Sequence, residues 1–169
     1  ITAHLATLGL HFDAFYSGYL ASGAQVEQIL SMLDQLCDSE THIFVDPAFA
    51  DHGRRYSLID ESMPAQMRRL CARANTIVPN LTEAAFLLDE PYRPDISPDG
   101  LKEQLRRLAA MGPDRVVITS APATRPGHCA AVAYDREQGR FWKMESPYIP
   151  AFYPGTGDTF SSVLVGAFL

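Results

Sequence analysis

The stretch PGTGDTFSSVLVGAFL, residues 154–169, joins a glycine-rich loop to an apolar run that we expect to be helical from Thr159 to Leu169. A helix start presents backbone N–H groups that have no partner inside the helix, and the helix dipole adds partial positive charge there. Gly155 and Gly157 have no Cβ, so an anion can approach their backbone closely. The stretch therefore predicts a phosphate cradle, with Asp158 beside it as a candidate base.

The same residues would also suit an ordinary helix cap, because glycine and aspartate are common at helix starts. The stretch is not a Walker loop, since no Gly-Lys-Ser/Thr follows it. It is not a dinucleotide-binding fingerprint either, since the third glycine is missing. Four residues alone do not decide between a phosphate site and a cap, so the rest of the chain must.

Short β-rich runs alternate with amphipathic helical runs through most of the chain. The expected strands are 12–20, 41–45, 76–78 and 115–119, with a hairpin of 130–134 and 140–144. The expected helices are 21–36, which has Ser22 as its N-cap, 63–74, 81–88 and 100–111. This alternation predicts an α/β fold of three α/β/α layers, in which a mostly parallel central sheet carries helices on both faces.

Polar side chains follow each expected strand, at the edge where parallel sheets bind their ligands. They are Tyr19, Asp46, Asp51, Tyr56, Asn80, Glu83, Thr119 and Ser120. We expect all of them at one edge of the sheet, together with the glycine loop. Asn80 and Glu83 also have the spacing of a capping box, and the two aspartates suit turns, so structural roles stay open. A cap at a strand end can in addition hold hydrated Mg²⁺, which takes a few carboxylates, waters and phosphate oxygens.

Composition and charge narrow the class of protein. The chain has 169 residues, enough for one domain, and is 47% hydrophobic and 20% charged, which is typical of a globular protein. The net charge of −6 argues against nucleic acid or an anionic membrane as a partner. The densest basic cluster, Arg68, Arg69 and Arg73, has the spacing of a solvated helix face.

Cysteine usage and the chain ends add two expectations. Three widely spaced cysteines favour neither a disulfide framework nor a zinc site, and they fit a cytoplasmic location. The chain begins at Ile1 and stops within an apolar run at Leu169. We therefore expect a single domain over residues 1–169 that is incomplete at both ends.

Five motifs together resemble the ribokinase-like superfamily and, within it, the pyridoxal (vitamin B6) kinase family. They are SGYL at 17–20, DPxxxDxG at 46–53, NxTE at 80–83, ITS at 118–120 and GTGD at 155–158. The resemblance implies ATP-dependent phosphorylation of the 5′-hydroxymethyl group of pyridoxal, pyridoxine or pyridoxamine. It also implies ATP and Mg²⁺ as cofactors, and a homodimer that takes small molecules rather than nucleic acid or membrane.

The resemblance also implies a role for each candidate residue. Asp158 is the base that accepts the alcohol proton and so touches the substrate. The anion hole for the transferring phosphate consists of Gly155, Thr156 and Gly157. The positions that handle the ATP phosphates and Mg²⁺ are Asp46, Asp51, Asn80 and Glu83, of which Asp46 and Glu83 are the metal ligands. The nucleotide side is lined by Tyr56, Thr119 and Ser120, and Tyr19 lies beside the pyridine ring.

One departure and two alternatives accompany this interpretation. Ala50 stands where the family has a glycine, and if that position needs a positive φ, alanine costs about 1 kcal/mol and shifts Asp51. A hydroxymethylpyrimidine kinase of thiamine synthesis would have the same fold, although Asp51 and SGYL favour the B6 assignment. A non-catalytic ligand-binding relative is the other alternative, and the presence of Asp158 argues against it.

Overall fold

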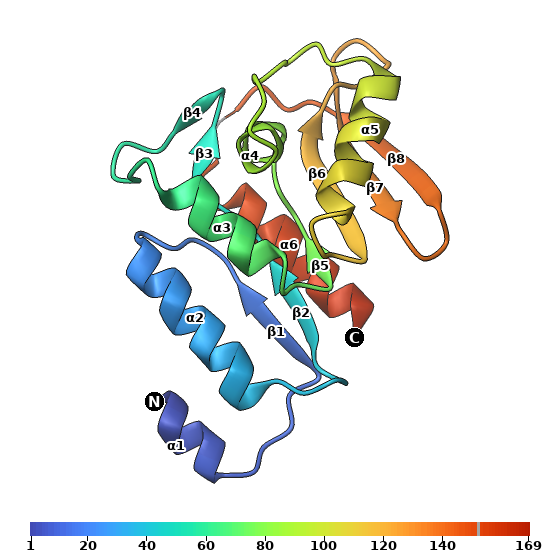
Figure 1. Ribbon diagram of the computed structural model, residues 1–169. Helices are drawn as coiled ribbons and strands as arrows, with labels where there is room; N and C mark the ends of the chain where they lie inside the picture. Colours follow the sequence, from blue (N-terminus) through green and yellow to red (C-terminus); the bar gives the residue numbers. More distant parts are fainter. Residues whose placement is uncertain (152) are drawn as a thin grey trace.

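The computed structural model describes residues 1–151 and 153–169, and its centre is a six-stranded sheet (Figure 1). The sheet has the order β1-β2-β5-β6-β7-β8. Its strands are β1 (Ala14–Ser17), β2 (His42–Val45), β5 (Thr76–Ile77), β6 (Arg115–Ala121), β7 (His128–Asp135) and β8 (Arg140–Pro147). The first four pair in parallel, and β7 and β8 add an antiparallel hairpin. The predicted, mostly parallel sheet is confirmed.

Helices cover both faces of the sheet. They are α1 (Thr2–Thr7), α2 (Gly23–Leu36), α3 (Met63–Cys71), α4 (Leu81–Leu87), α5 (Pro98–Ala109) and α6 (Thr156–Phe168). Neighbouring residues of β2 show the two faces, because side chains alternate along a strand. Val45 is buried in the core with Val26 of α2 and Met67 of α3, whereas the Phe44 ring contacts the Phe168 ring of α6. Figure 1 shows α6 behind the sheet and α2, α3 and α5 in front of it.

Local sequence explains where three helices begin. The Ser22 side chain accepts a hydrogen bond from the Gln25 N–H, which confirms the expected N-cap of α2. Helix α5 begins at Pro98, two residues before the expected start, because Ser97 caps it and proline suits the first helical position. Helix α6 begins at Thr156, three residues before the expected start, because Gly155 adopts a left-handed conformation with φ of 82° and is the N-cap.

The basic cluster, Arg68 and Arg69 on α3 and Arg73 just after it, does not form a purely solvated face, and this expectation is wrong for Arg68. The Arg68 guanidinium donates to the carbonyls of Phe86 and Leu87 at 3.1 and 2.7 Å, so it caps the C-terminus of α4. Arg69 pairs with Glu27 and Arg73 with Asp34, both of which lie on α2. The cluster therefore ties α3 to its two neighbours.

The hairpin of β3 (Ala50–Asp51) and β4 (Arg54–Arg55) was not expected from the sequence. Its turn residues His52 and Gly53 have φ values of 49° and 76°. A Cβ on Gly53 would approach the Tyr92 ring to 2.9 Å, so the turn requires glycine there. Ala50 is not among the non-glycine residues with positive φ in the described chain, so the cost considered for this position does not arise. None of the described helices has the length and apolar character that crossing a membrane requires.

Candidate active site

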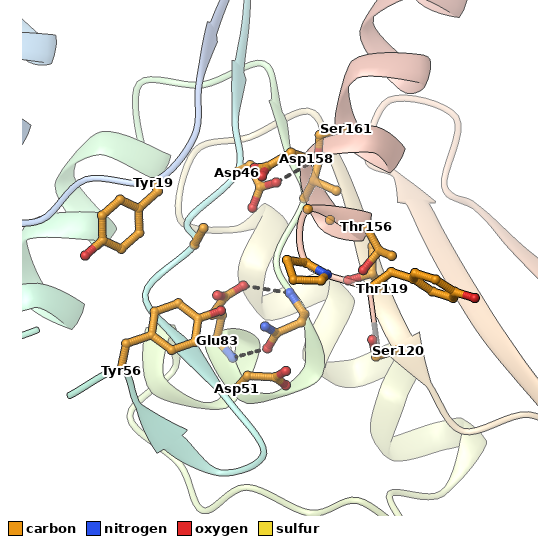
Figure 2. A pocket seen from close by; sticks show the side chains of 17 residues that line it. Tyr19, Asp46, Asp51, Tyr56, Glu83, Thr119, Ser120, Thr156, Asp158 and Ser161 are labelled. Atoms are coloured by element: carbon orange, nitrogen blue, oxygen red, sulfur yellow. Dashed lines mark hydrogen bonds between the residues drawn. The ribbon is translucent and has the colours of Figure 1, made fainter. Parts of the chain in front are cut away.

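A cavity of about 390 Å³ lies at the carboxyl edge of the parallel strands (Figure 2). All twelve candidate residues line it: Tyr19, Asp46, Asp51, Tyr56, Asn80, Glu83, Thr119, Ser120, Gly155, Thr156, Gly157 and Asp158. The predicted gathering at one edge of the sheet is therefore confirmed, while the individual roles stay predictions. Ala48, Val78, Tyr153, Pro154 and Ser161 complete the lining.

The N-terminus of α6 is open toward this cavity. Gly155 is the N-cap and, among the described residues, no side chain caps the helix start. Residues 155–158 are exposed, and a Cβ added to Gly157 would meet no atom within 4 Å. The N–H groups of the first turn therefore stay accessible, which suits them to an anion. Asp158 lies in this same first turn.

The N-terminus of α4 is closed by its own side chains. Asn80 Oδ1 accepts from the Glu83 N–H at 2.9 Å, and Glu83 Oε2 accepts from the Asn80 N–H at 2.8 Å. This reciprocal pair is the capping box that the spacing predicted. Figure 2 shows both hydrogen bonds as dashed lines beside Glu83.

The same two side chains also hold the preceding loop. Glu83 Oε1 accepts from the N–H groups of Phe49 and Ala50 at 3.1 and 3.3 Å. Asn80 Nδ2 donates to the Ala50 carbonyl at 2.7 Å. Because these bonds reach Phe49 and Ala50, which lie between Asp46 and Asp51, they fix the loop that carries both aspartates against the start of α4.

Asp46 is the buried carboxylate of this loop, with 6% of its surface exposed. Its Oδ2 accepts from Ser161 Oγ at 2.8 Å and lies 3.5 Å from Tyr16 Oη. Burial raises the pKa of Asp46, and the charge of Asp158 raises it further, while the hydrogen bond from Ser161 opposes the rise. Asp46 and Asp158 therefore interact electrostatically across the cavity.

Burial also shifts the pKa values of three neighbouring groups. It raises the pKa of Glu83 well above its usual range, and the hydrogen bonds from Asn80, Ala50 and Phe49 oppose that rise. Burial, followed by the charge of Asp46, raises the pKa of Tyr16 to about 12. Burial, followed by the charge of Glu83, raises the pKa of Tyr56 to about 12. Both phenols therefore stay protonated at neutral pH.

The charge of the cavity bears on whether magnesium fits. Four carboxylates line it (Asp46, Asp51, Glu83 and Asp158), and its described lining contains no lysine or arginine. A phosphate at the start of α6 would be repelled by these carboxylates unless a cation lay between them. Within the described residues no group of three or more His, Cys, Asp or Glu is arranged to hold a metal ion. Hydrated Mg²⁺ fits such a site, since it takes one or two carboxylates and fills its shell with water and phosphate oxygens.

The two ends of the cavity differ in character. Tyr19 and Tyr56 lie on one side in Figure 2, with ring centroids 6.5 Å apart. Thr119 and Ser120 lie on the other side, at an irregularity of β6 where Ser120 has a φ of 57°. The Thr119 N–H donates to the Pro79 carbonyl at 3.0 Å, so the end of β6 is tied to the residue before Asn80.

Sequence reasoning missed Ser161 and Tyr16. Ser161 lies three residues after Asp158 on α6, so helical spacing would have placed both on one face. Tyr16 pairs in register with Phe44 on the neighbouring strand, and its ring therefore lies on the α6 face of the sheet. A search for polar side chains at these spacings would have found both.

A mostly parallel sheet between two layers of helices, with an uncapped helix start and a carboxylate at the carboxyl edge of the sheet, defines the ribokinase-like fold class. The chain belongs to the phosphomethylpyrimidine kinase family, whose model matches residues 2–169.

Three relatives show how far the similarity extends. The pyridoxal kinase of Arabidopsis thaliana is 28% identical over 163 residues, which cover 93% of this chain and 51% of the relative. A Bacteroides thetaiotaomicron structure with pyridoxal, described as a candidate phosphomethylpyrimidine kinase, has a TM-score of 0.93 and 43% identity, over 98% of this chain and 58% of that one. The pyridoxal kinase of Leishmania donovani in complex with ADP and pyridoxamine has a TM-score of 0.79 and 25% identity, and the match covers 95% of this chain and 54% of that one. The chain thus spans little more than half the length of these relatives.

Proposed function

We propose that this chain carries the catalytic centre of an ATP-dependent vitamin B6 kinase, which phosphorylates the 5′-hydroxymethyl group of pyridoxal, pyridoxine or pyridoxamine. One observation carries the proposal: Asp158 lies in the first turn of a helix that is left uncapped toward a cavity with buried Asp46 on its wall. The pyridoxal in the Bacteroides structure and the ADP and pyridoxamine in the Leishmania structure support this choice of substrates.

In this proposal the start of α6 performs the transfer. Asp158 takes the proton from the alcohol as the alcohol oxygen attacks the γ-phosphorus of ATP, and the bond from that phosphorus to the β–γ bridging oxygen breaks, so that ADP leaves. The backbone N–H groups of Gly155, Thr156 and Gly157 donate to the oxygens of the transferring phosphate. Phosphoryl transfer depends mainly on positioning and charge stabilisation, so one carboxylate and a set of fixed donors are enough on the protein side.

Asp46 and Glu83 would hold Mg²⁺, and Asp51 and Asn80 would face the ATP phosphates. When bound, Mg²⁺ would neutralise phosphate charge that the four carboxylates otherwise repel. Glu83 already accepts three backbone hydrogen bonds, so it is better suited to hold the ion through a water molecule. Asp46 is the better direct ligand, because its described hydrogen bonds both reach Oδ2.

The remaining residues would bind the two substrates. On the nucleotide side we place Tyr56, Thr119 and Ser120. The half-exposed ring of Tyr19 would stack on the pyridine ring of the vitamer. A cytoplasmic location, a homodimer and the absence of nucleic-acid or membrane partners stay predictions, and light scattering of the purified protein tests the dimer.

A second candidate is hydroxymethylpyrimidine kinase, which the description of the matching family favours. A third is a ligand-binding relative without activity. The decisive experiment follows ADP formation with ATP and Mg²⁺ while offering pyridoxal, pyridoxine, pyridoxamine and hydroxymethylpyrimidine in parallel. We expect turnover with at least one B6 vitamer. Turnover with hydroxymethylpyrimidine alone would favour the kinase of thiamine synthesis. ADP binding without turnover of any substrate would favour the ligand-binding relative without activity.

A further inference from the structure

Helix α6 buries a hydroxyl rather than an apolar side chain. Among the described residues of this largely apolar helix, Ser161 alone is buried, with 1% of its surface exposed. Valine and phenylalanine side chains of the same helix, by contrast, stay exposed, Val163 at 66% and Phe168 at 45%. A buried hydroxyl is unfavourable unless it is hydrogen-bonded, so its partner explains its position.

That partner is the carboxylate of Asp46. Ser161 Oγ donates to Asp46 Oδ2 at 2.8 Å, and the bond is buried (Figure 2). The second donor near the same oxygen, Tyr16 Oη, is 3.5 Å away and contributes much less. Both donors reach Oδ2, so in the described contacts Oδ1 is the oxygen left for a ligand in the cavity. A hydrogen bond to a charged acceptor is among the stronger ones in proteins, and it fixes the rotation of the carboxylate.

We propose that Ser161 is a positioning residue, whose hydroxyl orients the Asp46 carboxylate toward the metal–phosphate site. Ser161 lies about one helical turn after Asp158 on α6, so it also fixes Asp46 relative to Asp158. The inference rests on the function proposed above. The helix that carries Asp158 also sets the direction of Asp46, so a single element aligns the base and the metal ligand. Ser161 itself touches neither substrate nor metal in this scheme.

The test compares three substitutions of Ser161 with one control. Ser161→Ala removes the hydroxyl and little else, Ser161→Cys keeps the volume but donates weakly, and Ser161→Thr keeps the hydroxyl. The control is Ser162→Ala, the same change at the next residue of α6, whose hydroxyl donates to the Asp158 carbonyl on the exposed side. Calorimetry measures ADP affinity with and without Mg²⁺ for each variant, beside kcat, KM and the melting temperature.

We expect Mg²⁺ to strengthen ADP binding in the parent protein, and Ser161→Ala and Ser161→Cys to reduce this gain about ten-fold. Affinity for ADP without Mg²⁺ should stay within about two-fold, and kcat should fall while KM for the alcohol changes little. Ser161→Thr should restore most of the gain, and Ser162→Ala should match the parent.

Three results would overturn the inference: a gain from Mg²⁺ that Ser161→Ala leaves unchanged, an equal loss in Ser162→Ala, or a fall in melting temperature with all binding constants intact. The binding measurement separates this inference from the proposed function. A parent protein that binds ADP with Mg²⁺ but phosphorylates no B6 vitamer would refute the function, and the Ser161 variants would still report on positioning.

Discussion

Two helix starts line the same cavity, and they are built in opposite ways. At the start of α4 the Asn80 side chain accepts from the Glu83 N–H, and the Glu83 side chain accepts from the Asn80 N–H. Helix α6 begins at exposed Gly155, where no described side chain caps the helix. The N-terminus of α4 is therefore used to stabilise the fold, whereas the N-terminus of α6 stays available for a ligand. A cap and an anion site are alternative uses of the same N–H groups, and the residue at the N-cap decides between them.

The largest effect should come from the carboxylate of the open helix start. Asp158→Asn keeps the size of the side chain and removes the base, so turnover should fall about 100-fold or more while ADP binding is kept. Steady-state kinetics and calorimetry measure the two quantities. Asp99→Asn is the matched control, because Asp99 lies exposed in the first turn of α5 and should leave turnover unchanged. Unchanged turnover in Asp158→Asn would remove the base from the scheme.

Next in size is the effect of opening the closed helix start. Glu83→Gln places an amide group where the carboxylate accepts three backbone N–H bonds, so the free energy of unfolding should fall by about 2 kcal/mol. Urea denaturation measures this change, and Glu103→Gln, on the exposed side of α5, is the control. If the stability of Glu83→Gln matched the parent and only the strengthening of ADP binding by Mg²⁺ fell, Glu83 would be a metal ligand rather than a residue that holds the loop in place.

A smaller effect should separate function from stability at the open start. Gly157→Ala places a Cβ where no protein atom lies within 4 Å, so the free energy of unfolding should change by less than about 1 kcal/mol. The added methyl group would crowd the bound phosphate, and turnover should fall about ten-fold. Gly166→Ala is the control on the same helix, because its Cβ also meets open space, away from the cavity. Equal turnover in both variants would argue against phosphate at residue 157.

The smallest effect concerns pH. The pKa of Glu83 is raised in the folded protein, so the native state binds its proton more tightly than the unfolded chain does. Its contribution to stability is therefore present at low pH and is lost as pH rises from the unfolded value of about 4.3 through the folded pKa. The stability difference between the parent and Glu83→Gln should therefore shrink from pH 5 to pH 8, by only a part of the roughly 2 kcal/mol expected for the substitution. A difference that grows with pH would reverse the sign and contradict the burial argument.

Much of the site could be predicted because strand order and strand direction place residues that are distant in sequence. Asp46 and Asn80 follow β2 and β5, and Thr119 lies near the carboxyl end of β6, so the three residues had to meet at one edge of the sheet. The capping box could also be predicted, since it needs only a spacing of three residues.

What could not be predicted depends on tertiary contacts or on short elements. The bonds from Phe49 and Ala50 to Glu83 require the loop to fold back over α4, which no local pattern indicates. The strands of the β3–β4 hairpin are two residues long, too short for a periodicity. Apolar spacing predicts the start of α6 at Thr159, three residues late, because the first turn, Thr156 to Asp158, contains no apolar side chain.

The bond between Ser161 and Asp46 also has a consequence for the order in which the protein folds. It joins residues 115 positions apart in the chain, whereas the Asn80–Glu83 pair spans three positions and the Glu83–Phe49 bond spans 34. Contacts between distant residues form slowly, because a long segment must find its place before the contact is made. We therefore expect the loop and α4 to assemble early and α6 to dock last, so that a refolding chain regains its sheet before it regains the ability to bind a nucleotide.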